Sequence, residues 1–305
     1  AGSVPEIYET YLVPLIFTQY AADVVARLKS RSVSKLLEIA AGTGAVTRAM
    51  ASGLPASVSI VATDLSQGML DQAAARGTSR PVEWRQADAM SLPFEDGSFD
   101  AVVCQFGVMF FPDRSKAYAE IRRVLKPGGV FIFNVWDRLD SNAYAEITTR
   151  ALESMFPNDP PRFLPRTPYG YNDPEILRQD LAKGGFTASP EIIAVPCPSS
   201  AASCEAVAIG YCQGTPMRGE IEAQGVGELE RVAPPRPFLE HRGGHARQPE
   251  LPGRIHGSTG SDDEFDLDER HVVLLDERDG QAVRQLEMLH RRHLEGGRRL
   301  GRLSL

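Results

Sequence analysis

The sequence predicts an α/β protein, built as a doubly wound, mostly parallel sheet with helices on both faces. From Lys35 onward, short apolar runs alternate with stretches of helical periodicity, and this alternation is typical of a parallel sheet. The last helical stretch ends at Pro127-Gly128-Gly129, which predicts a stop signal followed by a tight turn before the next strand.

Five apolar runs supply the predicted strands of this core, and three helix-like stretches connect them. The strands are LLEIA (36–40), VSIVAT (58–63), VEWRQA (82–87), FDAVVC (99–104) and VFIFNV (130–135). The helix-like stretches are TGAVTRAMASG (43–53), SQGMLDQAAARG (66–77) and SKAYAEIRRVLK (115–126). We therefore take residues 35–137 as the core of the protein.

Residues 1–34 predict an N-terminal helical lid. Within them, residues 5–29 carry apolar residues at mostly helical spacing, broken at Pro14, which predicts two short helices.

Residues 138–225 predict a cap segment together with the remaining helix and strand of the core. Up to Tyr171 the segment is Pro-rich, aromatic and too irregular for the sheet. DPEILRQDLAK (173–183) predicts a capped helix, EIIAVPCP (191–198) a sixth strand, and residues 201–223 a helical region.

Residues 226–305 form a divergent C-terminal tail. All six histidines lie in it, thirteen arginines but no lysine follow Val226, and no tyrosine appears after Tyr211. A shifted reading frame of a GC-rich gene tends to produce such an amino-acid composition, so we interpret the tail as frame-shifted. The alternative is a genuine tail, in which HVVLL (271–275) supplies an antiparallel strand and residues 279–296 a closing helix.

Charge and composition restrict the partners and the compartment. A formal net charge of −7 argues against nucleic acid or an anionic membrane as the main partner. No apolar run approaches the roughly 20 residues needed to cross a bilayer, and the N-terminus lacks the layout of a signal peptide. We expect a cytoplasmic enzyme with a small-molecule substrate. The oligomeric state stays open, with a homodimer as one alternative.

The first chemical signal is Glu38-Ile39-Ala40-Ala41-Gly42-Thr43-Gly44, which ends a strand and opens a helix. Gly42 and Gly44 carry no side chain, so the backbone can pass close to a ligand there. An ordinary Gly-rich turn explains the same residues, and this motif alone leaves the two interpretations about even.

Asp64 is the second signal, at the end of the second strand and 20 residues after Gly44. In a doubly wound sheet a carboxylate at this place can accept hydrogen bonds from both ribose hydroxyls. The alternative is a helix-capping acid, since Ser66 and helix residues follow. Leu65 and Met69 can cover an adenine face, a role that is compatible with core packing.

The third signal, Gln86-Ala87-Asp88-Ala89, closes the third strand. Asp88 offers a carboxylate to an adenine amino group, and Ala89 offers a backbone N–H to the ring. Three sites at three successive strand ends thus converge on one adenosine. NAD would need a third glycine where Thr47 stands, and Glu38 before the turn is unusual for NAD.

Four segments resemble successive motifs of the type 11 small-molecule methyltransferases, the class I S-adenosylmethionine-dependent group that contains quinone-biosynthesis C-methyltransferases. They are LLEIAAGTGAVT, VATDLSQGML, QADAMSLPFEDGSFDAVVCQFGVMFF and EIRRVLKPGGVFIFNVWD. The resemblance covers about residues 4–225 and is dense across 35–137. It implies a Rossmann-like, seven-stranded sheet whose last strand is antiparallel. It also implies S-adenosyl-L-methionine over the carboxyl ends of strands one to four, so that 35–137 is the core that binds it.

The resemblance also implies roles for single residues. Residues 40–44 would hold the methionine part, although the family often has glycine where Ala40 stands, and residues 105–107 would face the amino group and the sulfonium. Tyr8 and Tyr11 resemble lid residues, with two buried helix aromatics as an equal alternative. The expected cofactor-binding residues are Glu38, Ala40, Gly42, Gly44, Asp64, Leu65, Met69, Asp88, Ala89 and Gln105.

The sequence supplies no clear catalytic base. Methyl transfer from a sulfonium is an in-line displacement that is helped by alignment and by excluding water. No histidine precedes His241, so Asp137 and Tyr144 are the weak candidates, with Tyr169 and Tyr171 behind them. A structural role is favoured for each. We expect catalysis mainly by proximity and desolvation, on a phenol, enol, quinol or carboxylate.

Parts of the sequence also fit other functions. Asp137, Asp140 and Asn142 faintly match a metal-dependent O-methyltransferase, and Glu-x-x-His-x-x-His at 287–293 has helical spacing, but we expect no metal site. A non-catalytic protein that holds S-adenosylmethionine or S-adenosylhomocysteine is the main alternative function. An NAD-dependent oxidoreductase fails on Thr47 and on the missing catalytic Tyr/Lys or His pair.

Overall fold

The sheet follows the predicted α/β, doubly wound class. The computed structural model describes residues 3–233 and the backbone of residues 265–275. In the described residues the strand order is β3-β2-β1-β4-β5-β7-β6, with β1 to β5 parallel and β7 antiparallel to both of its neighbours. The strands are β1 (Lys35–Ile39), β2 (Ser59–Asp64), β3 (Glu83–Gln86), β4 (Phe99–Gln105), β5 (Leu125–Trp136), β6 (Glu191–Ala201) and β7 (Phe265–Leu275).

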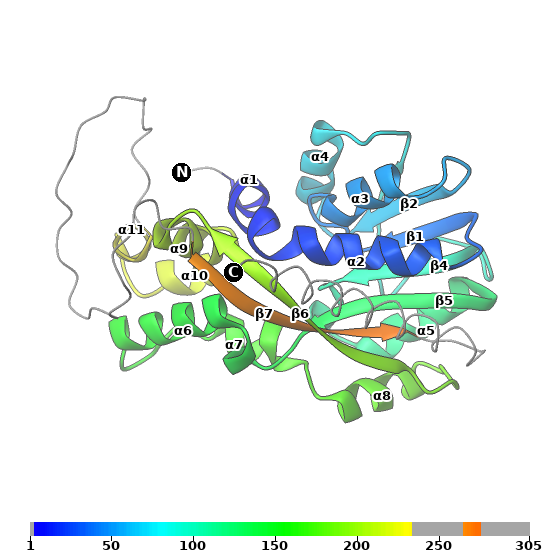
Figure 1. Cartoon of the computed structure of the whole chain (residues 1–305). Coiled ribbons are helices and arrows are strands. Elements are labelled where there is room, and N and C mark those ends of the chain that lie inside the picture. Colours follow the sequence, from blue (N-terminus) through cyan, green and yellow to red (C-terminus); the bar gives the residue numbers. More distant parts are fainter. Residues whose placement is uncertain (1–2, 234–264, 276–305) are drawn as a thin grey trace, which may run out of the picture.

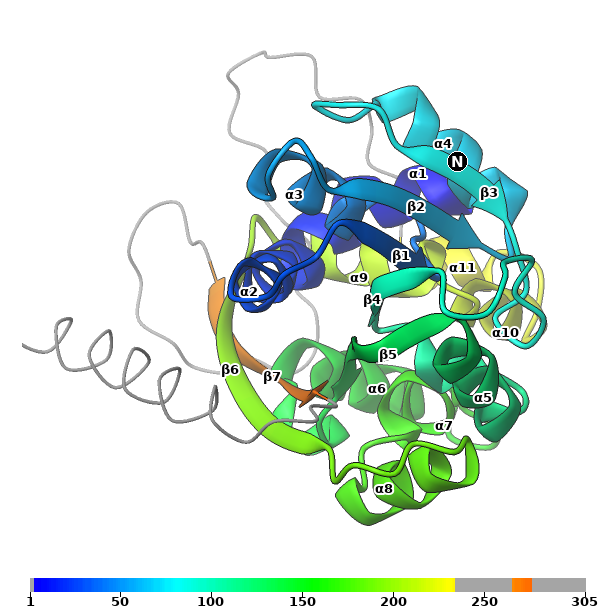
Figure 2. The same cartoon turned by 90° about the vertical axis from the view of Figure 1, so that its right-hand side faces the viewer.

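The predicted apolar runs form the central strands of the sheet, because these strands are buried on both faces and therefore favour apolar side chains. Every residue of β1 after Lys35 is buried, and so are residues 101–104 of β4. On one face, α2 (Thr18–Lys29) and α3 (Ala45–Gly53) pack on the sheet, and on the other lies α5 (Arg114–Val124) with α8 (Pro174–Lys183) against it (Figure 2).

One predicted boundary is wrong. The helix expected to end at Pro127 ends at Val124, and β5 already begins at Leu125. Leu125 pairs with Phe99, whereas the next pair is Ala101 with Val130, so the intervening Pro-Gly-Gly residues form an irregularity inside the strand pair. Strand pairing on both sides of the turn therefore outweighs the local stop signal.

The N-terminal region is one helical run rather than two helices broken at Pro14. It consists of α1 (Val4–Ile7), the π-helix η1 (Tyr8–Phe17) and α2. Pro14 lies inside the π-helix, where the wider winding accommodates a residue that cannot donate a backbone hydrogen bond. Thr18 closes this segment, because its backbone N–H and its hydroxyl both bond to the Val13 carbonyl.

The cap is helical, and the segment expected to be irregular contains a helix of three to four turns, α6 (Ala143–Met155). The other helices and turns of the cap are η3 (Leu139–Ser141), α7 (Phe163–Arg166), η4 (Pro168–Gly170), α9 (Cys204–Gln213) and α10 (Met217–Glu222). The core adds α4 (Gln67–Arg76) and the short turn η2 (Val108–Phe110), and α11 (Glu228–Val232) follows the cap. Figure 1 shows α6, α7, α9 and α10 gathered at one end of the molecule, where α9 lies beside α1. Asp173 caps α8 as predicted, accepting a hydrogen bond from the Glu175 N–H.

Part of the C-terminal tail enters the sheet. The backbone of residues 271–275 pairs with residues 132–136 of β5 in antiparallel register. This is the antiparallel strand that we expect from these residues if the tail is genuine. Residues 279–296 and the motif at 287–293 lie outside the described residues, and the frame shift stays a prediction.

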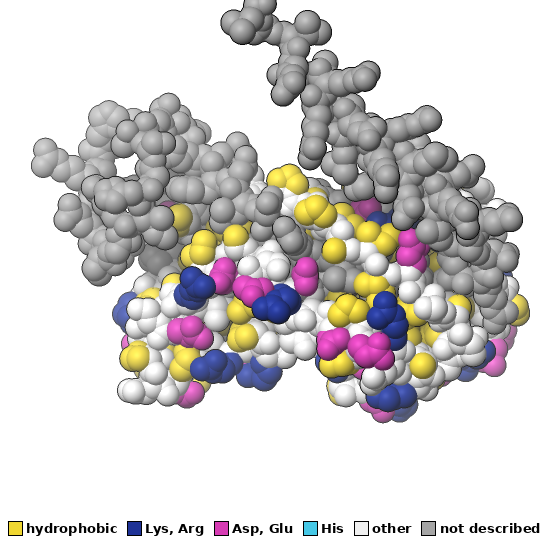
Figure 3. Space-filling view, turned by 60° about the horizontal axis from the view of Figure 1, so that its bottom comes forward, with side chains coloured by type: hydrophobic (Ala, Val, Ile, Leu, Met, Phe, Trp, Pro, Cys, Tyr) yellow, Lys and Arg dark blue, Asp and Glu magenta, His cyan; other side chains and the backbone are white. Residues whose placement is uncertain are grey.

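Two general properties of the described residues complete the fold. None of their helices combines the length and the apolar character needed to cross a membrane. On the face drawn in Figure 3, basic and acidic side chains lie interspersed rather than in patches of one sign.

Candidate functional site

A cavity of about 410 Å³ lies at the carboxyl ends of the parallel strands, beneath the N-terminal segment and the cap. This volume is in the range of small-ligand pockets. The lining residues come from 4–17, 39–42, 64–69, 87–90, 105–112, 136, 163–169 and 211–216. Of the ten residues expected to bind a cofactor, eight line it, and Glu38 and Gly44 do not.

The first turn is held open by left-handed backbone. Ala40, Gly42 and Gly44 have φ values of +54°, +56° and +82°. A side chain at Ala40 is strained in this region, which explains why glycine suits the position better. A β-carbon on Gly44 would lie 3.0 Å from the Trp84 ring and 3.1 Å from Ala73, so Gly44 serves packing behind the cavity.

Glu38 supports the turn from behind instead of lining the cavity. It is 2% exposed, and its Oε2 accepts a hydrogen bond from the Thr47 hydroxyl at 2.5 Å. Burial raises the pKa of Glu38 to about 8, while the Thr47 hydrogen bond acts in the opposite direction. Glu38 is thus not among the described residues that line the cavity, and its contact with a cofactor stays a prediction.

Asp64 lies at the wall of the cavity and joins the first two turns. Its Oδ2 accepts from the Gly42 N–H and its Oδ1 from the Ser66 N–H, each at 2.8 Å. Burial raises the pKa of Asp64, and these backbone hydrogen bonds oppose the rise. Each carboxylate oxygen accepts more than one hydrogen bond, so capacity remains for hydroxyls of a ligand.

Asp88 and Ala89 lie at the end of β3, on a loop that α5 holds in place. Asp88 Oδ1 accepts from the Met90 N–H at 2.8 Å, and both residues line the cavity. Leu65 and Met69 line the same part, and Leu65, at 69% exposed, forms its rim.

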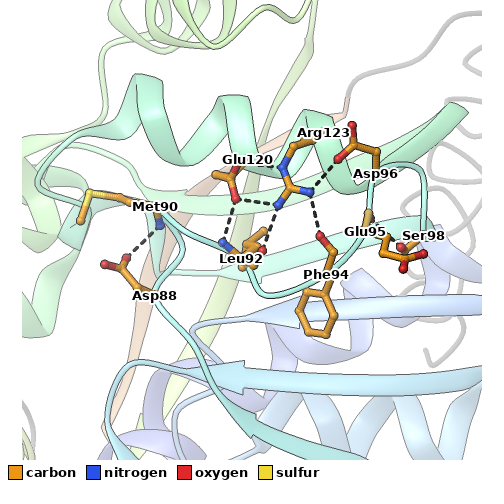
Figure 4. A network of polar contacts seen from close by, with 9 residues as sticks. All are labelled: Asp88, Met90, Leu92, Phe94, Glu95, Asp96, Ser98, Glu120 and Arg123. Carbon is orange, nitrogen blue, oxygen red and sulfur yellow. Dashed lines mark hydrogen bonds and ion pairs between the residues drawn. The ribbon is translucent and has the colours of Figure 1, made fainter.

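The loop after Asp88 is bound to one guanidinium (Figure 4). The N–H groups of Arg123 donate to the carbonyls of Leu92 and Phe94 and to the carboxylates of Asp96 and Glu120, at 2.7–2.9 Å. Glu120 also accepts from the Leu92 N–H at 2.8 Å. The ion pair with Arg123 lowers the pKa of Glu120. This network was not identified from the sequence, since nothing in an E-x-x-R spacing specifies a distant loop.

Gln105 carries an acceptor without a partner. Its Nε2 donates to the Phe17 carbonyl at 3.2 Å, whereas its buried Oε1 has no hydrogen-bond partner among the described residues. Beside it, a β-carbon on Gly107 would lie 2.6 Å from the Ala40 β-carbon and from Cys104 Sγ. A glycine is therefore required where this strand end meets the first turn.

The rest of the wall is mostly apolar and combines aromatic with aliphatic side chains, and the sequence did not identify it. Phe106 and Trp136 stack with ring centroids 3.9 Å apart, and Phe17 packs edge-on against both. Tyr169 and Tyr211 come from the cap, with hydroxyl oxygens 3.5 Å apart. Periodicity gave no signal, because an apolar residue on a cavity wall looks like one in the core.

Of the two lid tyrosines, only Tyr8 lines the cavity. Burial and the nearby charge of Asp64 raise the pKa of Tyr8. Tyr11 is not among the described residues that line the cavity. It instead packs against Gly210 of α9, which agrees with the alternative of a packed helix aromatic.

The weak catalytic candidates do not reach the cavity. Tyr144 donates its hydroxyl to the Ser199 carbonyl at 3.3 Å. Asp137 follows the last residue of β5 and is not among the described lining residues, and its carboxylate accepts from the Arg138 N–H. Asp140 pairs with Arg138, and across the described ranges no three His, Cys, Asp or Glu side chains are grouped as metal ligands.

Comparison with known proteins gives matches to the same part of the chain. Residues 37–133 match the family described as "Methyltransferase domain". Demethylmenaquinone methyltransferase of Thermus thermophilus is 29% identical over 174 residues, which cover 53% of this chain and 79% of the relative. Ubiquinone/menaquinone biosynthesis C-methyltransferase UbiE of Pseudomonas aeruginosa is 31% identical over 169 residues, 51% of this chain and 66% of the relative.

A solved structure is similar in fold over a larger share of the chain. The YcgJ protein from Bacillus subtilis superimposes with a TM-score of 0.50 at 17% identity, covering 86% of this chain and 100% of that one. At this identity the likeness concerns the fold alone.

Proposed function

Because the chain belongs to the type 11 family of class I S-adenosylmethionine-dependent methyltransferases, we propose that it methylates a phenol, enol or quinol held in the apolar half of the cavity. The observation that carries this proposal is the uneven distribution of polar groups along the wall. Among the described residues of the wall, carboxylates occur only at the ends of β2 and β3, and most of the remainder is apolar, including the aromatic side chains of Phe17, Phe106 and Trp136.

The wall favours an uncharged acceptor over a carboxylate. No Lys, Arg or His is among the described residues that line the cavity, whereas Asp64 and Asp88 both do. A carboxylate would lose its hydration without gaining a cationic side chain from the described wall, which costs several kcal/mol. A neutral ring loses little on entering such a pocket and can stack on Phe106 and Trp136.

The residues at the strand ends fit S-adenosylmethionine. Asp64 would hold the ribose hydroxyls, Asp88 and the Ala89 N–H the adenine edge, and Leu65 and Met69 its faces. The unpartnered Oε1 of Gln105 is an acceptor suited to an ammonium or sulfonium group. When bound, the cofactor supplies an electrophilic methyl group on a positively charged sulfur.

The chain contributes mainly alignment and the exclusion of water. The N-terminal segment and the cap close over the cavity, so an acceptor lies next to the cofactor site in a medium with few polar groups. The hydroxyls of Tyr169 and Tyr211 are suited to orient the acceptor oxygen by hydrogen bonds. With Asp137 and Tyr144 outside the cavity, the acceptor would ionise by its own acidity.

The relatives favour turnover and point to a quinol-type ring. One is named as a demethylmenaquinone methyltransferase and the other as a ubiquinone/menaquinone biosynthesis C-methyltransferase, which disfavours a protein that only holds the cofactor. This chain's own acceptor is a proposal that draws on those names together with the aromatic wall.

A panel of acceptors tests the proposal. The enzyme is incubated with S-adenosylmethionine and 1,4-naphthohydroquinone, a substituted phenol or benzoate, and S-adenosylhomocysteine is quantified by chromatography. We expect turnover with the hydroquinone or the phenol, no turnover with benzoate, and loss of turnover in Asp64→Ala. Turnover with benzoate alone would contradict the proposed acceptor class, and absence of S-adenosylmethionine binding would contradict the cofactor assignment.

A further inference from the structure

One buried carboxylate links the N-terminal segment to two elements of the cofactor site. Glu9 follows Tyr8 in the π-helix, and its side chain is 4% exposed. Its Oε1 accepts from Arg48 Nη2 at 2.6 Å and lies 3.3 Å from Arg76 Nε. Arg48 lies near the start of α3, and Arg76 is the last residue of α4.

The same arginine reaches the glycine turn. Arg48 Nη1 donates to the Thr43 carbonyl at 2.6 Å, and Thr43 stands between Gly42 and Gly44. A planar guanidinium can hold a carboxylate and a carbonyl at once, which a lysine ammonium does less well. The other partner, Arg76, ends the helix that begins after Asp64.

We propose that Glu9 is a positioning residue, which latches the N-terminal segment (residues 4–17) over the cavity through Arg48 and Arg76 and thereby sets how fast the spent cofactor leaves. The inference rests on the proposed function, since it takes S-adenosylmethionine and S-adenosylhomocysteine as ligands of this cavity.

Geometry gives the reason. Val4, Tyr8, Leu12, Ile16 and Phe17 of the segment line the cavity, so movement of the segment opens this wall and widens the path by which a ligand leaves. That movement separates Glu9 from both arginines. Its second oxygen, Oε2, is buried without a hydrogen-bond partner among the described residues, so the ion pairs at Oε1 are what compensates this buried charge.

Release kinetics of S-adenosylhomocysteine test the latch. We expect Glu9→Gln to release the ligand about tenfold faster in stopped-flow fluorescence, a factor that corresponds to about 1.4 kcal/mol. Arg48→Lys should approach the same rate, because it keeps the charge but loses the double contact. Arg76→Gln, which changes a side chain that is 44% exposed, should give a smaller increase in the same direction. Glu146→Gln breaks a remote ion pair on α6 and is the matched control.

Two further measurements separate a latch from general destabilisation. Amide hydrogen exchange should accelerate in residues 4–17 and 42–44 of Glu9→Gln and not in β4 or β5. Because the Glu9 carboxylate is buried and weakly screened, raising the salt concentration should leave the ratio of the release rates of Glu9→Gln and the wild type nearly unchanged.

The outcomes are distinct. If wild type and Glu9→Gln release S-adenosylhomocysteine at the same rate, or if exchange accelerates throughout the molecule, the latch is wrong. If Glu9→Gln does not fold, an unchanged release rate in both Arg48→Lys and Arg76→Gln overturns it. Failure of the wild type to bind S-adenosylhomocysteine would instead overturn the proposed function.

Discussion

Asp64 does two tasks with one carboxylate. It fixes the first glycine turn through the Gly42 N–H and the start of α4 through the Ser66 N–H, and it faces the cavity at the place proposed for the ribose. A charged acceptor at this junction therefore affects both the shape of the site and its direct contacts.

We expect Asp64→Ala to weaken S-adenosylmethionine binding by one to two decades, or roughly 1.5–3 kcal/mol, because hydrogen bonds to a charged acceptor are lost. Isothermal calorimetry measures this directly. Asp71→Ala on the exposed side of α4 removes a carboxylate that contacts only Gln67 among the described residues, and it should bind normally. Equal affinity in wild type and Asp64→Ala would refute the ribose assignment.

Glu38 makes stability depend on pH. Burial raises its pKa to about 8 from an ordinary 4.5, so between these values the folded protein holds a proton that the unfolded chain has lost. The free energy of unfolding should therefore fall as pH rises through this window, and this contribution should level off above about pH 8.

Glu38→Gln should remove that part of the pH dependence while keeping the acceptor for the Thr47 hydroxyl. Urea unfolding at pH 5, 7 and 9 measures it, with Glu175→Gln as the exposed control. The variant should gain stability relative to the wild type as pH rises. A constant difference between the two across this range would mean that Glu38 keeps an ordinary pKa.

Among the elements, the loop between β3 and β4 depends on a helix that is far away in the sequence. All of its anchors to α5 converge on Arg123 and Glu120 (Figure 4). Because the same loop begins at Asp88, its order decides where the proposed adenine contacts lie.

We expect Arg123→Lys to lower the free energy of unfolding by about 1–3 kcal/mol, since buried carbonyl and carboxylate groups lose donors. Amide exchange should accelerate within residues 88–98, and S-adenosylmethionine affinity should fall with it. Arg122→Lys, on the exposed side of the same helix, is the matched control. Indistinguishable stability and exchange in the two variants would show that the clamp does not order the loop.

The whole molecule is arranged to enclose an acceptor in the cavity and not to supply a catalytic base. The strand ends contribute the part of the cavity proposed for the nucleoside (the nucleoside half), while the N-terminal segment and the cap, together with Phe106 and Trp136, contribute most of the apolar half. Proximity and desolvation are the rate effects that such an enclosure can provide.

Asp137→Asn and Tyr144→Phe should each reduce kcat less than tenfold, because neither side chain reaches the cavity. The pH–rate profile should follow the pKa of the acceptor when substituted phenols are compared. A loss of 10²–10⁴-fold in either variant, as expected for a general base, would require a different mechanism. Tyr169→Phe provides a cavity-lining comparison.

The nucleoside half could be predicted from the sequence. Its residues follow consecutive parallel strands, and the carboxyl ends of such strands meet at one edge of the sheet, so short motifs at 38–44, 64–69 and 86–89 could be placed beside one another without coordinates. The strands themselves were recognisable because a strand buried on both faces must be apolar along its whole length. Strand position alone did not tell that Glu38 lies behind the turn against Thr47 and not in the cavity wall.

Only the tertiary structure brought together the apolar wall, the loop clamp and the ion pairs of Glu9. Phe17, Phe106, Trp136 and Tyr211 are far apart in the sequence, and each alone has the pattern of a core residue. Glu9 and Arg48 are 39 residues apart, beyond the three or four positions over which helix periodicity brings charges together. Local patterns record interactions between near neighbours in the chain, whereas an enclosed cavity and its ion pairs arise when distant elements pack against one another.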